Sequence, residues 1–171
     1  MDDQLRRKYQ HLLDFVSRYQ KVGVACSGGV DSTFLAHACV RALGLEQVII
    51  LFGDSTLQSA DLRDSIEKRL AGDLGEELQL RKVAVDPFSN GAFVKNSRDR
   101  CYICKTYIYQ KFLDLLTSLE VEVLLDGTNC DDLHDDRPGL KALEELGIIS
   151  PLVEAGFIKD EIRRAAESLG L

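Results

Sequence analysis

Short apolar runs alternate with amphipathic segments along this chain, and that alternation constrains the fold more than any other feature. The apolar runs lie at 21–26 (KVGVAC), 47–52 (QVIILF), 78–85 (LQLRKVAV) and 121–125 (VEVLL). Apolar residues at helical spacing follow at 31–43, 59–74, 101–119, 141–146 and 159–169. Strands that alternate with helices form parallel sheets with helices on both faces. The sequence therefore predicts a doubly wound α/β fold, with Ile148-Ile149 as the edge strand of a five-stranded sheet.

Length and charge limit the classes of protein that fit. The chain has 171 residues, 45% of them hydrophobic, which is enough for one core, so we expect a single domain over 1–171. A net charge of −7 argues against nucleic acid as a partner, because polyanions bind clustered basic residues. No apolar stretch could span a membrane, and the start of the chain is charged and amphipathic, unlike a signal peptide. We expect a cytoplasmic protein whose five cysteines are reduced.

The segment CSGGVDST stands where the first predicted strand becomes the first predicted helix. Gly28 and Gly29 allow a sharp bend, and free N–H groups of the loop and first helical turn can bind an anion. Ser27 and Ser32 add hydroxyl donors, and Asp31 offers an oxygen ligand to the Mg²⁺ that accompanies a polyphosphate. The alternative is a glycine-containing helix N-cap with no ligand. The segment is not a Walker A loop, which requires Gly-Lys-Ser/Thr, so we predict another kind of phosphate-binding loop.

This loop resembles SGGxDS, the PP-loop of the N-type ATP pyrophosphatases, which include GMP synthetase, asparagine synthetase and tRNA thiolation enzymes. These enzymes cleave ATP between the α and β phosphates and adenylate a substrate oxygen. The segments NSRDRCYICK and DGTNCDDLHDDRPGLKAL further resemble the ATP-dependent sacrificial sulfur transferases of the LarE type. The three segments follow that family's order, and the resemblance covers about residues 21–171.

The LarE-type resemblance implies a substrate and a set of site residues. Such enzymes adenylate a carboxylate of a pyridinium mononucleotide, and a sulfur nucleophile then displaces AMP on the way to the nickel-pincer nucleotide. The implied ATP-binding residues are Ser27, Gly28, Gly29, Asp31, Ser32, Gly53, Ser55, Asp126 and Gly127. The implied catalytic residues are Asp31, Lys105 and Arg137, and Asp31 also binds Mg²⁺. Lys141 is either a further substrate-binding cation or ordinary surface charge.

Cys101 and Cys104 form a CxxC pair with several interpretations: a zinc half-site, a redox pair, two ligands of a cluster, or two cysteines without a ligand. Their position at a helix start, beside Arg100 and Lys105, favours thiolates. Family members that use an iron–sulfur cluster pair this CxxC with a third cysteine further on. The resemblance therefore implies a cluster through Cys101 and Cys104 that is at best labile in these residues.

The family continues beyond the segment that matches the end of this chain. Its further part carries the third cysteine, a Ser-Arg pair and a smaller C-terminal domain that helps bind the substrate. We expect that domain to be absent from these residues and to be supplied by a longer parent protein, by a separate chain, or within a homo-oligomer. Carboxylate activation without sulfur transfer is the expected activity. A tRNA-thiolating PP-loop enzyme and a nucleotide-binding module without catalysis stay open as alternatives.

Overall fold

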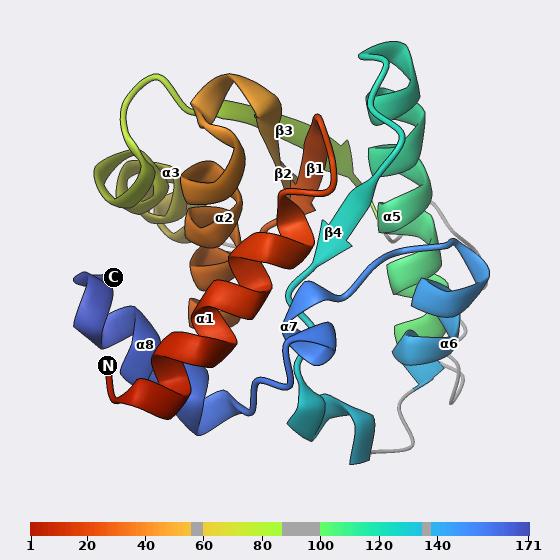
Figure 1. The fold of residues 1–171 in the computed structure, drawn as a ribbon. Helices are drawn as coiled ribbons and strands as arrows, with labels where there is room; N and C mark the ends of the chain where they lie inside the picture. The colour runs from red at the N-terminus through yellow and green to blue at the C-terminus, as the bar shows by residue number, and fades with distance from the viewer. Residues whose placement is uncertain (56–59, 87–99, 135–137) are drawn as a thin grey trace.

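The computed structural model describes residues 1–55, 60–86, 100–134 and 138–171, and a parallel sheet lies at its centre (Figure 1). The strands are β1 (Val22–Ala25), β2 (Val48–Ser55), β3 (Gln79–Val85) and β4 (Leu124–Asp126), in the order β3-β2-β1-β4. The helices are α1 (Asp3–Val16), α2 (Val30–Leu43), α3 (Ala60–Leu74), α5 (Arg100–Ser118), α6 (Pro138–Glu145), α7 (Pro151–Glu154) and α8 (Lys159–Leu169). The described residues also form the short 3-10 helices η1 (Leu45–Gln47) and η3 (Cys130–His134). The predicted alternation of strands and helices is confirmed.

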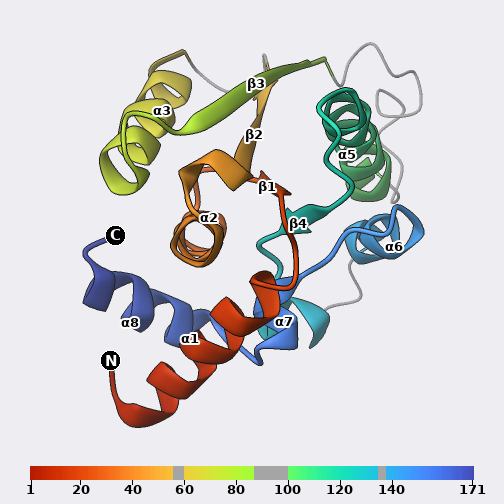
Figure 2. The ribbon, with the colours of Figure 1, turned by 45° about the horizontal axis from the view of Figure 1, so that its top comes forward.

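Helices cover both faces of the sheet, as Figure 2 shows. Because successive side chains of a strand point to opposite faces, β2 contributes to two cores. Ile50 and Phe52 pack into a core that includes residues of α1, α2, α3, α7 and α8. Ile49 and Leu51 pack into a second core with residues of α5 and α6. All four side chains are buried, which explains why this strand reads as an uninterrupted apolar run.

The fifth strand predicted at Ile148-Ile149 is wrong, because the described residues form a sheet of four strands. Ile149 makes one isolated parallel bridge, to Leu125. Its N–H donates to the Leu124 carbonyl at 3.1 Å, and its carbonyl accepts from the Asp126 N–H at 2.9 Å. Pro151 starts α7 directly afterwards, and a proline has no N–H with which to continue a ladder. The chain therefore turns into a helix instead of extending the sheet.

The strand order places a crevice at one end of the sheet. β1 pairs in parallel with β2 on one side and with β4 on the other, through pairs such as Val22 with Val48 and Gly23 with Leu124. The chain passes from β1 to β2 on one side while β4 pairs on the other side, so the strand order reverses at β1, and ligands of open α/β sheets bind at such a point. The described residues contain no helix long and apolar enough to cross a membrane.

Candidate nucleotide-binding site

The glycine loop joins β1 to α2, and the hydroxyl of Ser32 closes it. Ser32 Oγ accepts from the Ser27 N–H at 3.2 Å and donates to the Gly29 carbonyl at 3.0 Å. Gly29 is the N-cap of α2, and no side chain of the described residues caps that end. The N–H groups of the first helical turn lack intrahelical partners, so they are suited to bind an anion.

The two glycines of the loop have different surroundings. Gly28 has a φ of +79°, which favours glycine, and an added Cβ would lie 2.7 Å from the Ile66 side chain of α3. The guanidinium of Arg69, also on α3, donates to the Gly28 carbonyl. A Cβ on Gly29 would meet only Ser27 Oγ, at 3.5 Å, and Gly29 lines a cavity. Helix α3 therefore supports the loop from behind, and Gly29 is the glycine on the cavity side.

Asp31 lies in the first turn of α2, and among the described residues only one of its carboxylate oxygens has a hydrogen-bond partner. Its Oδ2 accepts from Asn129 Nδ2 at 3.2 Å and lies 3.7 Å from Lys159 Nζ. Its Oδ1 is buried and has no hydrogen-bond partner among the described residues. Burial raises the pKa of Asp31, while the nearby Lys159 ammonium opposes that rise. A buried carboxylate oxygen without a partner, on a side chain that lines the cavity, fits the predicted Mg²⁺ ligand.

The turn after β4 packs directly on the start of α2. Asp126 is buried and accepts hydrogen bonds from Tyr109 Oη, from Thr128 Oγ1 and, at 2.7 Å, from the Thr128 N–H. Burial and the adjacent carboxylate raise the pKa of Tyr109 well above its usual value, so its hydroxyl stays a donor. A Cβ on Gly127 would lie 3.0 Å from backbone atoms of Ser32, so this approach requires glycine. Asp126 therefore holds the turn in shape.

Two cavities adjoin at this end of the sheet. The first, of about 370 Å³, is lined by Ala25, Cys26, Ser27, Gly29, Asp31, Ser32, Phe52, Gly53, Lys105, Ile108, Tyr109, Phe112, Asp126, Gly127, Thr128 and Asp132. The second, of about 430 Å³, is lined by Cys101, Cys104, Lys105, Thr128, Asp132, Pro138, Gly139 and Leu140. Three residues, Lys105, Thr128 and Asp132, line both. The Lys105 ammonium lies 4.0 Å from Asp126 Oδ2 and is partly exposed, so a cation stands at the junction.

The cysteine pair opens α5 and lines the second cavity, as predicted for a cleft position. The expected thiolate is not favoured at Cys104, because burial and the neighbouring Cys101 raise the pKa of its thiol. Arg100 opposes that rise but does not outweigh it. The described residues contain no group of three or more His, Cys, Asp or Glu side chains that could hold a metal ion. An iron–sulfur cluster on Cys101 and Cys104 is therefore not supported by this part of the chain.

The remaining predicted site residues differ in whether they line a cavity. Gly53, in β2, lines the first cavity beneath Ile108 and Phe112 of α5, at distances that leave room for an added Cβ. Ser55 is buried at the end of β2 and is not among the described residues that line either cavity. Arg137 lies outside the described residues. Lys141 pairs with Glu145 on the surface of α6, which fits the interpretation as ordinary surface charge.

Lys159 and Asn129 contact Asp31, although the sequence did not single them out. Asn129 follows the turn after β4 and is fully buried. Its place in the DGTN segment is the sequence feature that could have identified Asn129 as a candidate site residue. Lys159 reaches Asp31 because α8 packs against α2, and no short spacing in the sequence announces a contact of that kind.

Comparison with known proteins agrees with this arrangement. A sequence model described as NAD synthase matches residues 5–99, which is more than half of the chain. The chain belongs to the NAD synthase family. A relative of this NAD synthase-family chain, an uncharacterised protein of Synechocystis, is 33% identical over 98% of the chain and 61% of its own length. The pyridinium-3,5-bisthiocarboxylic acid mononucleotide synthase of Lactiplantibacillus plantarum is 34% identical over 98% of the chain and 59% of its own length. The predicted PP-loop membership and the LarE-type resemblance are confirmed.

A solved structure shows the same fold. The glutamine-dependent NAD⁺ synthetase of Acinetobacter baumannii, determined with adenosine diphosphate, superposes with a TM-score of 0.73 at 15% identity. The match covers 96% of the NAD synthase-family chain and 32% of the other protein. The α/β architecture with a parallel sheet is therefore shared. The chain spans only 59–61% of the length of the two relatives described above, so the activity of a whole protein of this kind is a matter for proposal.

Proposed function

We propose that the chain uses ATP to adenylate a carboxylate of a pyridinium mononucleotide, releasing pyrophosphate, ahead of sulfur transfer in nickel-pincer nucleotide biosynthesis. The observation that carries the proposal is the pair of adjoining cavities with Lys105 at their junction. A nucleotide in the first cavity and an acceptor in the second would meet at that junction. Holding two reactants in a fixed orientation lowers the barrier to their reaction.

The first cavity suits ATP. The N–H groups at the start of α2 and the open side of Gly29 would receive the phosphates. Asp31 would hold Mg²⁺ through its unpaired oxygen, and the metal charge would stabilise the departing pyrophosphate. The apolar side chains of Phe52, Ile108 and Phe112 would contact the base and ribose.

The reaction needs one attack and one departure. A carboxylate oxygen of the acceptor forms a bond to the α phosphorus, and the bond from that phosphorus to the bridging oxygen breaks. Pyrophosphate leaves with the electron pair, and the acyl adenylate remains in the site. Lys105 can turn from Asp126 toward the acceptor carboxylate, because its ammonium is only loosely paired at 4.0 Å. We assign it the role of orienting that carboxylate for attack.

The acceptor class is supported by the Lactiplantibacillus relative, whose name describes a bisthiocarboxylic acid product. A pyridinium mononucleotide with carboxylates at the same positions is the natural precursor of such a product. We propose that residues 1–171 act as one PP-loop domain for the adenylation step. We assign sulfur delivery to another part of a longer protein, to a separate chain or to a second copy. The longer relatives support that division.

Product analysis tests the proposal. The purified chain is incubated with Mg²⁺, ATP and pyridinium-3,5-biscarboxylic acid mononucleotide, and nucleotides and phosphates are separated. We expect pyrophosphate in an amount equal to the sum of the acyl adenylate and the AMP that its hydrolysis releases, all formed only when the acceptor is present. Release of ADP and phosphate, or of AMP without the acceptor, would contradict the proposal. Binding of tRNA with a steep dependence on salt would favour the tRNA-thiolating alternative instead.

Lys105 provides the matched variant for the acceptor. Lys105→Met should lower kcat/KM for the carboxylate by at least about tenfold, which is about 1.4 kcal/mol of transition-state stabilisation. ATP affinity should change by less than about twofold, because the assigned contact is to the acceptor. Lys111 lies on the same helix but lines neither cavity among the described residues, so Lys111→Met serves as the control. An equal loss in both variants would remove Lys105 from this role.

A further inference from the structure

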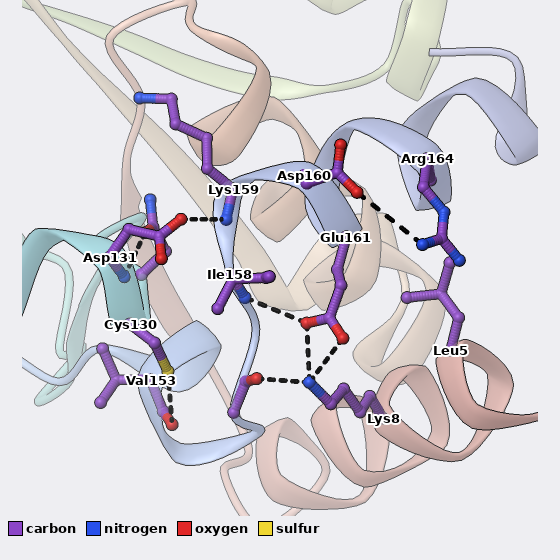
Figure 3. A network of polar contacts seen from close by, with 12 residues as sticks. Leu5, Lys8, Cys130, Asp131, Val153, Ile158, Lys159, Asp160, Glu161 and Arg164 are labelled. Carbon is purple, nitrogen blue, oxygen red and sulfur yellow. Dashed lines mark hydrogen bonds and ion pairs between the residues drawn. The ribbon is translucent and has the colours of Figure 1, made fainter.

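A network of polar contacts surrounds the start of α8 and includes Lys8 of α1 and Asp131 of η3 (Figure 3). Lys8, on α1, places its ammonium 2.7 Å from both carboxylate oxygens of Glu161 and donates to the Gly156 carbonyl at 2.7 Å. Glu161 Oε2 also accepts from the Ile158 N–H at 3.1 Å. One ion pair therefore ties α1 to two backbone groups that precede α8.

This ion pair is more enclosed than a second ion pair between the same helices. The Lys8 and Glu161 side chains are 26% and 15% exposed. The pair between Arg164 and Asp2, which also joins α8 to α1, is 51% and 54% exposed. Exposed ion pairs contribute little to stability, whereas an enclosed pair that also bonds to the backbone holds its position more firmly. The start of α8 is thus fixed by Lys8 and Glu161.

Lys159 is the first residue of α8, and its backbone N–H and its side-chain ammonium each lie near an aspartate. Its N–H donates to Asp131 Oδ2 at 2.8 Å, and its Nζ lies 3.7 Å from Asp31 Oδ2. In Figure 3 its side chain extends away from Glu161 and Lys8. A lysine side chain is flexible, so the place of its backbone decides which groups its ammonium can reach.

We infer that Lys8 and Glu161 are positioning residues for the nucleotide site, because they hold the start of α8 where the Lys159 ammonium lies 3.7 Å from Asp31, a residue that lines the first cavity. Neither residue lines a cavity among those described, and both act through Lys159. When Mg²⁺ and ATP occupy the site, the ammonium beside Asp31 adds positive charge where the pyrophosphate leaves. This inference rests on the proposed function, because it requires ATP to bind at the glycine loop.

A double-mutant cycle tests the inference with Mg²⁺ and ATP as the probe, measured by calorimetric titration. Lys159→Met and Glu161→Ala should each weaken binding by about tenfold. The double variant should bind no more than about twofold more weakly than Lys159→Met alone, because Glu161 acts through that lysine. Glu161→Gln retains an acceptor for the Ile158 N–H, so it should recover part of the affinity. Arg164→Ala is the control: it removes the ion pair with Asp2 and should leave binding within about twofold.

The structural effect of these variants is measured separately by thermal unfolding, and titrations are run where every variant is folded. If Glu161→Ala does not fold, Lys8→Met replaces it in the same cycle. The inference is overturned if Glu161→Ala, or its replacement, binds Mg²⁺ and ATP as the unmodified chain does. It is overturned equally if the losses from the two single variants multiply in the double variant. Absence of ATP binding in the unmodified chain would overturn the proposed function as well, which separates the two failures.

Discussion

At the scale of single residues, the carboxylate of Asp31, the proposed Mg²⁺ ligand, is held in the fold at some expense to stability. One of its oxygens is paired with Asn129 and lies near Lys159, while the other is buried without a described partner. Burial raises the pKa of Asp31, so the ionised form is less favourable in the fold than in the unfolded chain. A metal ion would supply the missing partner.

Asp31→Asn should therefore separate binding from stability. We expect ATP binding in the presence of Mg²⁺ to weaken by at least about tenfold, because the amide cannot supply an anionic ligand. The ligand-free variant should be more stable than the unmodified chain at pH 7. Burial raises the pKa of Asp31 in the folded chain above the unfolded value of 3.8. The contribution of this group to the stability of the unmodified chain is therefore fully present below pH 3.8 and is lost as pH rises through the folded pKa. Urea unfolding at pH 7 and below pH 3.8 checks this, and a difference that grew at the lower pH would contradict it.

The two loop glycines give a second prediction at this scale. Gly29→Val should reduce ATP affinity by at least about tenfold, because the new side chain would occupy phosphate space on the cavity side. Its free energy of unfolding should fall by no more than about 1 kcal/mol, the usual range for changing an N-cap. Gly28→Ala should cost more stability, since φ is +79° and Ile66 stands in the way. Denaturant unfolding and ATP titration of both variants test this prediction. A larger loss of stability in Gly29→Val than in Gly28→Ala, with a smaller loss of ATP affinity, would refute the placement of Gly29 on the cavity side and of Gly28 against α3.

At the scale of helices and strands, the sequence predicts an element well when any apolar layer can cover it, whatever residues make up that layer. Strand β2 reads clearly because apolar layers cover both of its faces. The glycine loop reads clearly because its function depends on backbone atoms of one short segment. The prediction of an extra strand at Ile149 was wrong, because this residue makes one isolated bridge and Pro151 starts a helix soon after it. Lys159 could not be predicted as a site residue, because the packing of α8 against α2 brings it to Asp31.

The contact between the turn after β4 and the start of α2 gives a prediction at this scale. Gly127→Ala should lower the free energy of unfolding by about 1–3 kcal/mol, because the added Cβ would meet backbone atoms of Ser32 at 3.0 Å. Backbone cannot move aside as a side chain can. Gly53→Ala is the control, since its nearest new contact would be at 3.5 Å. Thermal and urea unfolding of both variants measure the difference, and equal losses would show that the close approach is not maintained in solution.

At the scale of the whole molecule, the described residues bring together the cavity at the glycine loop and an adjoining one, and the cysteine pair is among the residues that line the second. We expect residues 1–171 to release pyrophosphate without forming thiocarboxylate. Cys104 is half-buried and burial raises the pKa of its thiol, so it is poorly prepared as a nucleophile near neutral pH. Mass spectrometry of the acceptor, alongside a pyrophosphate assay, checks both products. Efficient thiocarboxylate formation would identify one of the five cysteines as the sulfur donor.

The strand order also bears on how the molecule folds. β1 pairs on one side with β2, the next strand along the chain, and on the other side with β4. β4 is far from β1 in the sequence: Gly23, for example, pairs with Leu124. Pairing across so long a stretch of chain is slow, because the intervening loop must close before the contact forms. A newly made chain could therefore bend its glycine loop early and still lack a nucleotide site. ATP added during refolding should act late, by stabilising the docked form of the last strand rather than by speeding the first collapse.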